Sequence, residues 1–158
     1  MEAEDLIGQP APAWQLSDAQ GGVSRLTDFL GRPLLVLFFS IDCPACVGRA
    51  LPFSRLVAAR YPALRIVGIH SQLEGGRAHT PEQVRAVAER QQFSHPVLLD
   101  DGGTTFSAYG ASGTPHWVLI DAQGIVRKSF WGSTQGPQQR LEYALQEHFS
   151  GAHPVQPP

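Results

Sequence analysis

The chain has 158 residues, of which 42% are hydrophobic and 16% charged, and its formal net charge is −2. This is the composition of a globular protein rather than a disordered one. It contains no long basic block and no apolar run near the roughly 18 residues that cross a bilayer, so nucleic-acid binding and a membrane span are both disfavoured. At this length we expect one domain over residues 1–149 and a flexible tail over 150–158.

The first five residues carry three acidic side chains, and they lack the basic and apolar regions of a signal peptide. We therefore expect a cytoplasmic location. The alternative is an exported protein whose leader was removed before this sequence begins. Two cysteines in a chain of this length are too few for a disulfide framework, which favours redox chemistry or metal binding.

Turn-forming residues punctuate the first 32 positions. Residues 14–16 and 23–24 predict a small hairpin, followed by one helical turn at 26–30. The apolar run 34–40 then predicts a central strand that is covered on both faces.

A helix is predicted over residues 44–60. Pro44 suits its first turn, and Pro52 is expected to kink it. Leu51, Leu56 and Val57 are its expected core contacts.

The second half of the chain continues the alternation of strands and helices. Thr80 precedes Pro81, Glu82 and Gln83, which is a strong helix start because the threonine side chain can cap the first turn. The expected elements are a strand at 64–70, a polar loop at 71–79, a helix from 80 onward, a strand at 95–99, a short helix or turn at 104–109, a hairpin of strands at 116–120 and 125–130, and a last helix at 137–149. This order predicts an α/β fold, a three-layer sandwich around a mixed sheet, with ligand chemistry at the carboxyl ends of the strands.

Cys43-Pro44-Ala45-Cys46 follows the apolar strand and opens the predicted helix. Unpaired N–H groups and the helix dipole at this end stabilise a thiolate on the first cysteine. The second sulfur lies about one turn further on, within reach for a small disulfide. This spacing indicates a dithiol that cycles between reduced and oxidised forms. One alternative is a structural disulfide. Another is a zinc site, which would need two further ligands from distant histidines.

Three segments together resemble the thioredoxin superfamily, and more narrowly its TlpA/ResA-like branch. They are the opening residues 7–16, the strand, loop and helix start at 38–46, and the segment 113–121 that contains Thr114-Pro115. Residues 66–71 are also similar to thioredoxin-like domains fused to NHL repeats. The resemblance covers roughly residues 6–149 and implies a thioredoxin-like α/β/α sandwich with an N-terminal β-hairpin extension.

The resemblance also implies a thiol–disulfide oxidoreductase without a cofactor or metal. Cys43 would be the nucleophile and Cys46 the resolving thiol. Pro115 would be the cis-proline that faces the sulfurs and leaves the Thr114 backbone free to pair with an extended substrate. The expected partners are a disulfide-containing protein or small molecule and an external electron donor.

Four positions depart from the family's pattern. Asp42 stands where a tryptophan usually precedes the first cysteine, and Leu37 stands where thioredoxin has a buried acid. Arg49 replaces the glutamate of the TlpA/ResA-like branch, and Pro52 falls one residue later than the usual proline. The proton-handling groups around the redox pair therefore differ from those of the family.

Asp42, Pro44, Ala45, Thr114 and His116 complete the expected surroundings of the thiols. Asp42 would either repel a thiolate, accept a proton or remain a solvated acid. His116 would either lie near the sulfurs, where a cation favours thiolate, or point away from them. The other five histidines show no metal-ligand spacing and are expected to be structural or solvent-facing.

Two other functions compete. Ser40-Ile41-Asp42-Cys43 matches the Thr/Ser-x-x-Cys of a peroxiredoxin-like thiol peroxidase, although the proline expected three residues earlier is Leu37. A copper carrier could hold Cu(I) through both cysteines and one histidine, because soft thiolates select that ion. No histidine is singled out for the second role.

Overall fold

The computed structural model describes residues 2–72, 77–132 and 135–148. The predicted tail at 150–158 lies outside this range. The elements in chain order are the 3-10 turn η1 (Ala3–Leu6), β1 (Gln15–Asp18), β2 (Val23–Arg25), η2 (Leu26–Asp28), β3 (Leu34–Phe39), the π-helical turn η3 (Cys46–Ala50), α1 (Leu51–Arg60), β4 (Arg65–Ser71), α2 (Pro81–Arg90), β5 (Val97–Asp100), η4 (Asp101–Gly103), α3 (Thr104–Ala108), β6 (His116–Ile120), β7 (Val126–Trp131) and α4 (Gln135–His148).

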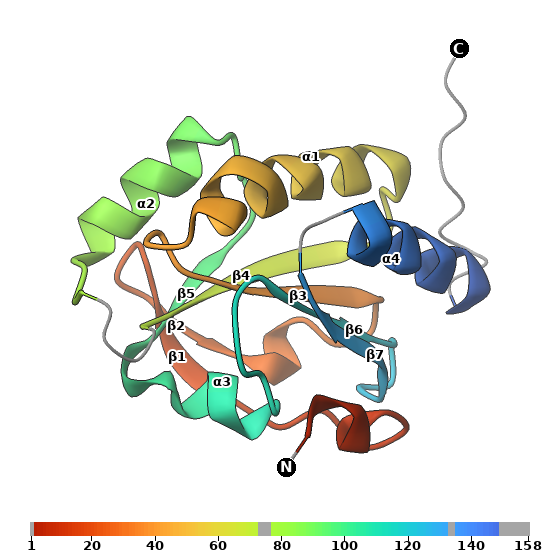
Figure 1. Cartoon of the computed structure of the whole chain (residues 1–158). Helices are drawn as coiled ribbons and strands as arrows, with labels where there is room; N and C mark the ends of the chain where they lie inside the picture. The colour runs from red at the N-terminus through yellow and green to blue at the C-terminus, as the bar shows by residue number, and fades with distance from the viewer. Residues whose placement is uncertain (1, 73–76, 133–134, 149–158) are drawn as a thin grey trace.

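A mixed sheet in the order β2-β1-β5-β4-β3-β6-β7 runs through the molecule (Figure 1). The pairs β3–β4 and β4–β5 are parallel, and the remaining pairs are antiparallel. All six residues of β3 are buried, as the apolar run predicted. The mixed sheet and the central position of this strand are confirmed.

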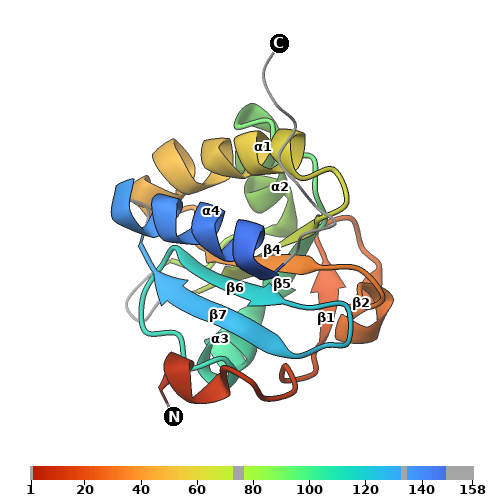
Figure 2. The ribbon, with the colours of Figure 1, turned by 90° about the vertical axis from the view of Figure 1, so that its right-hand side faces the viewer.

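Helices and short turns cover both faces of the sheet (Figures 1 and 2). The alternating side chains of β3 divide the interior into two cores. Leu35, Leu37 and Phe39 pack in the core beneath α1, α2 and α4. Leu34, Val36 and Phe38 pack in the opposite core, which Leu6, Leu26 and Tyr109 also line. The predicted three-layer arrangement is confirmed.

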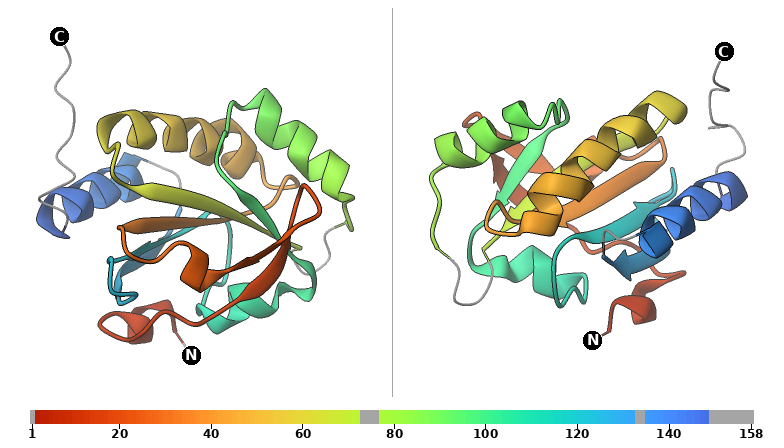
Figure 3. Two further views of the ribbon diagram at one scale, coloured as in Figure 1. Left: turned by 180° about the vertical axis from the view of Figure 1, so that it is seen from behind. Right: turned by 45° about the horizontal axis from the view of Figure 1, so that its top comes forward.

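The N-terminal segment passes along the α3 side of the sheet from one edge to the other (Figure 3). At the first edge, Gly8 N–H donates to Val126 O (2.8 Å), and Val126 N–H donates to Gln9 O (2.9 Å). At the other edge, the predicted hairpin forms as β1 and β2, and β1 pairs with β5. The sheet thus gains strands beyond β5 from the predicted N-terminal extension.

The helix that follows Cys43 starts at Pro44, includes Cys46 and contains one wide turn. In that turn Leu51 N–H donates to Cys46 O, a π-helical bond five residues back. Pro52 follows at once and has no N–H to donate. The distortion expected at Pro52 therefore takes the form of a π turn.

One expected core contact is wrong. Leu51 and Val57 are buried, but Leu56 is 57% exposed. The inward face of α1 follows Phe53 and Val57, four residues apart, and Leu56 lies about 100° around the helix from Val57. The cap of α2 is confirmed, since Thr80 Oγ1 accepts from Gln83 N–H and the Gln83 side chain accepts from Thr80 N–H.

Candidate active site

Cys43 lies at the carboxyl end of β3, at the start of the helix. The tight turn that begins at Ser40 brings it there, because Cys43 N–H donates to Ser40 O (3.1 Å). Cys46 is the first residue of the wide turn η3. The strand end and the helix start predicted from the sequence therefore meet at the two cysteines.

The two thiols, both free, differ sharply in environment. Cys43 is partly exposed, whereas Cys46 is fully buried in the core beneath α1. The Cys46 backbone N–H donates to Cys43 Sγ (3.2 Å), and Cys43 Sγ lies 3.5 Å from Thr114 O. A helix N-terminal N–H directed at the exposed sulfur stabilises negative charge there.

Burial, together with the hydrogen-bonding contact with Cys43, raises the pKa of the Cys46 thiol to about 12. Cys46 therefore keeps its proton while Cys43 is the thiol that meets solvent. This division suits an exposed attacking thiol and a buried resolving thiol.

The Thr114–Pro115 peptide bond is cis, as the resemblance implied. Pro115 is buried, and its carbonyl accepts from Gly132 N–H (2.9 Å), which ties the segment to the end of β7. Thr114 Oγ1 is buried and finds no hydrogen-bond partner within the part of the chain that the structure describes. The backbone of Thr114 thus forms one wall of the cysteine site.

Asp42 turns toward His79. Its Oδ2 lies 2.9 Å from His79 Nε2, a close contact whose angle falls outside that of an aligned hydrogen bond. Asp42 Oδ2 also accepts from Arg77 N–H (3.3 Å). The contact with His79 is the main cause that lowers the pKa of Asp42. Its carboxylate thus carries a charge next to Cys43, paired with a histidine.

His70 was not expected at the site, yet it supports the turn before Cys43. Its Nε2 accepts from Ile41 N–H (3.2 Å), and its ring packs edge-on against Phe39 and His79. Burial lowers the pKa of His70 to about 4, so the ring is neutral and can accept this bond. The sequence feature that could have indicated this role is the position of His70 near the carboxyl end of the strand next to β3.

His116 takes the second of its two expected orientations and points away from the sulfurs. Its neighbour in β6, Trp117, faces the core that holds Cys46. His116 packs against Phe38, and its Nε2 lies 2.8 Å from Ser129 Oγ. Burial lowers the pKa of His116 to about 4.

Neither of the two acids that related proteins carry near the cysteines is present, because Leu37 and Arg49 occupy their positions. Leu37 is fully buried among apolar side chains, and Arg49 is exposed on the helix surface. A buried acid does exist in Asp100, at the end of β5. It accepts from Ser71 Oγ and from the N–H groups of Thr105 and Phe106, which start α3. Asp100 is a helix cap rather than a partner of the cysteines.

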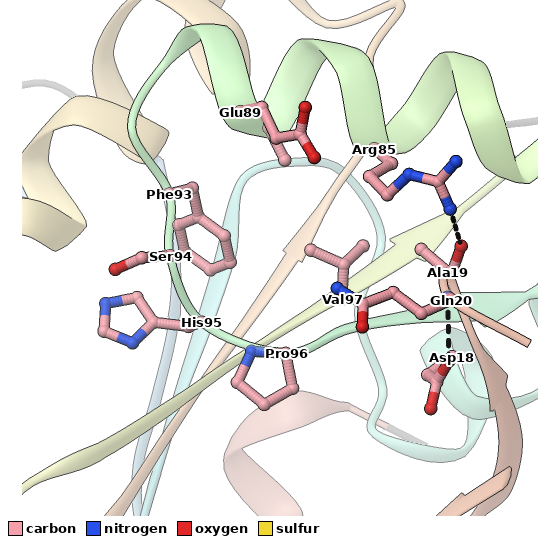
Figure 4. A pocket seen from close by; sticks show the side chains of 11 residues that line it. Asp18, Ala19, Gln20, Arg85, Glu89, Phe93, Ser94, His95, Pro96 and Val97 are labelled. Atoms are coloured by element: carbon pink, nitrogen blue, oxygen red, sulfur yellow. Dashed lines mark hydrogen bonds between the residues drawn. The ribbon is translucent and has the colours of Figure 1, made fainter. Parts of the chain in front are cut away.

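No group of three or more Cys, His, Asp or Glu side chains that could hold a metal occurs within residues 2–72, 77–132 and 135–148. A separate cavity of about 500 Å³ lies between α2, the turn after β1 and the start of β5. Figure 4 shows the side chains that line it. One Arg85 nitrogen on its wall already donates to Ala19 O (2.9 Å), and neither cysteine lines the cavity.

The sequence profile of the AhpC/TSA family matches residues 7–129. The chain belongs to the AhpC/TSA family. Its relatives in this family include the thiol-disulfide oxidoreductase ResA of Geobacillus thermodenitrificans, 30% identical over 128 residues that cover 80% of this chain and 70% of ResA. A Mycobacterium tuberculosis protein provisionally named a peroxiredoxin is 30% identical over 125 residues, covering 78% of this chain and 75% of that protein.

A crystal structure from Chlorobium tepidum, provisionally described as a thiol:disulfide interchange protein, superimposes with a TM-score of 0.76 at 23% identity. It covers 89% of this chain and 96% of that one, and it establishes the thioredoxin-like fold. The CxxC pair and the family relatives together make this AhpC/TSA protein a thiol–disulfide oxidoreductase, as predicted.

Proposed function

We propose that the protein reduces disulfides by a two-step exchange. The Cys43 thiolate attacks one sulfur of the substrate disulfide, a mixed disulfide forms, and the other substrate sulfur leaves as a thiolate. Cys46 then gives up its proton and attacks Cys43 Sγ, which releases the second substrate thiol and leaves a Cys43–Cys46 disulfide. An external donor of two electrons restores the dithiol.

The unequal burial of the two thiols carries this assignment. Only Cys43 is open to a substrate sulfur, and the Cys46 N–H that donates to Cys43 Sγ (3.2 Å) brings the resolving residue alongside it. The Thr114 carbonyl closes the site on the other side. Protein and small-molecule disulfides both remain within the proposal.

A peroxidase is the second candidate, favoured by the peroxiredoxin-like relative and by the spacing of Ser40 and Cys43. Here Cys43 would attack a peroxide oxygen to give a sulfenic acid, and Cys46 would condense with it to a disulfide and water. Against this role, the buried Ser40 Oγ already accepts from Asp42 N–H (3.1 Å). Hydrogen peroxide consumption by the reduced protein separates the two activities.

We further propose a reducing role in the cytoplasm, with export as the alternative. Among the helices that the structure describes, none has the length and apolar character needed to cross a bilayer. Since related dithiols have potentials from about −270 mV for a reductant to about −120 mV for an oxidant, the potential indicates the direction of transfer.

The deciding experiment is a redox titration of Cys43 and Cys46 in dithiothreitol buffers, read by thiol alkylation. A reversible two-electron transition near about −270 mV supports the reductase, and one near about −120 mV indicates an oxidant and favours export. Absence of a reversible transition contradicts disulfide exchange. The Cys46→Ser variant is the matched control, because it retains the exposed thiol and cannot form the internal disulfide.

A further inference from the structure

Three side chains outside the CxxC motif meet at the turn that presents Cys43. Asp42 belongs to the turn itself, His79 precedes α2, and His70 is the penultimate residue of β4. His79 Nε2 lies 2.9 Å from Asp42 Oδ2, and the two imidazole rings pack edge to face with centroids 5.9 Å apart. Residues far apart in the sequence thus form one charged and hydrogen-bonded cluster beside the nucleophile.

His70 is not the cation of this cluster. His70 Nε2 accepts from Ile41 N–H, so protonation of this nitrogen would break the bond that supports the turn. Burial and the neighbouring His79 both lower the pKa of His70, while Asp42 and Asp101 raise it more weakly. Of the two rings, His79 is the one that faces the Asp42 carboxylate.

A negative charge on the residue before Cys43 opposes formation of the Cys43 thiolate. A protonated His79 cancels that charge, and the backbone N–H of Arg77 adds a further favourable contact to the same oxygen. The Arg77 side chain is the other cation near Asp42 on that loop, and its electrostatic effect on Asp42 is the weakest. His79 is therefore the side chain that the structure places against the Asp42 carboxylate at contact distance, and in its protonated form it is a cation.

We propose that His79 is a positioning residue that acts through Asp42, holding its carboxylate and neutralising its charge so that Cys43 can react as a thiolate. This inference rests on the proposed function, in which Cys43 is the attacking thiol. The Asp42–His79 pair would then set the charge next to the Cys43 sulfur. Leu37 and Arg49, which stand in place of the family's acids, supply no carboxylate there.

The test is the rate at which iodoacetamide alkylates Cys43 in the reduced protein, measured from pH 5.5 to 8.5 at low and high salt. The Cys46 thiol is fully buried, so we expect it to react much more slowly than Cys43. The variants are His79→Gln, Asp42→Asn and the double variant, with His95→Gln as the matched control because His95 lies on the separate cavity of Figure 4.

At low salt and pH 6.5, His79→Gln is expected to slow alkylation about three- to tenfold, the effect of one unneutralised charge on a neighbouring residue. The difference should shrink at high salt, because dissolved ions screen the effect of one charge on its neighbour. The double variant should react like Asp42→Asn, since His79 acts only through that carboxylate. His95→Gln should not change the rate.

A slower rate that is independent of salt, or a double variant slower than Asp42→Asn, would show a purely structural role and overturn the proposal. An unchanged rate in His79→Gln would overturn it as well. Alkylation needs no turnover, so these outcomes are distinct from failure of the redox titration, which concerns the proposed function itself.

Discussion

Only two residues separate Cys43 from Cys46, yet one sulfur is open to solvent and the other is enclosed. The difference arises from the helix, since its first turn carries the chain from the surface into the core beneath α1. In the proposed mechanism the two thiols react in order. The exposed Cys43 thiol attacks first, and the buried Cys46 thiol, with its raised pKa, reacts only after the mixed disulfide has formed.

Replacing the resolving thiol should therefore arrest the reaction halfway. In Cys46→Ser we expect a stable one-to-one mixed disulfide with a disulfide substrate and loss of multiple turnover, because no second thiol can displace the substrate from Cys43. Mass spectrometry of the non-reduced protein measures the adduct. Cys43→Ser is the matched control and should form none. An equal adduct in Cys43→Ser would show that Cys46 is reachable and reverse the assignment.

Among the elements, β4 supports the active-site strand in a way that depends on one small residue. Gly68 lies in the middle of β4, opposite Leu37 of β3. A Cβ at this position would lie 2.9 Å from Phe39 Cε1 and 3.0 Å from Phe93 Cε1, which is closer than such atoms normally approach. Phe39 in turn packs on His70 and ends the strand that leads to Cys43. The close packing at Gly68 thus helps to fix Phe39, the last residue of β3 before the turn that carries Cys43.

Gly68→Ala should destabilise the fold by about 1–3 kcal/mol, the usual cost of overpacking a filled core. The free energy of unfolding in urea measures the effect. Gly48→Ala is a suitable control, because a Cβ at that helical position meets no atom within 4 Å. Equal stability of Gly68→Ala and the unmodified protein would mean that Phe39 and Phe93 move apart without cost.

At the scale of the whole molecule, two buried histidines lie on opposite faces of the sheet and share one electrostatic property. Burial lowers the pKa of both His70 and His116 to about 4, well below the ordinary value. The unfolded chain therefore binds protons at these residues near pH 6.5, whereas the folded chain binds them only near pH 4. Their contribution to stability is complete above about pH 6.5 and is lost as the pH falls toward 4.

Between pH 7.5 and pH 5 we expect this linkage to reduce the free energy of unfolding by on the order of 2 kcal/mol per histidine. Urea unfolding at the two pH values measures the loss. In His116→Gln the loss should fall by on the order of 2 kcal/mol, because the contribution of His116 is removed while those of His70 and the partly buried His95 remain. If the variant shows the same pH dependence as the unmodified protein, His116 does not carry the assigned linkage.

The sequence predicted most of the fold because its strands are unambiguous apolar runs with clear turn residues between them. It also located the dithiol and the cis-proline, whose motifs are local. The position of Leu56 was misjudged because the inward face of α1 was not fixed before the wide turn at Cys46–Ala50 was known. A π turn rotates every later side chain and leaves little trace in the sequence apart from Pro52.

The roles of His70 and His79 could not be found from spacing, for a different reason. They lie 28 and 37 positions after Asp42, and only the pairing of β4 with β3 and the return of the chain before α2 bring them to the turn. The sequence around His116 allowed its side chain to point either toward the sulfurs or away from them. The alternation of β6, in which Trp117 occupies the inner core, decided between them.

The path of the first thirty residues has a consequence for how this protein behaves in solution. Exposed sheet edges present unpaired backbone groups on which other chains can add strands and aggregate. Here the same short segment protects both sides, with residues 8–11 bonded along the start of β7 and the hairpin shielding β5. The outermost strand that remains, β2, has only three residues. We therefore expect the N-terminal extension to limit edge-to-edge association, because its removal would expose unpaired backbone groups on β5 and at the start of β7.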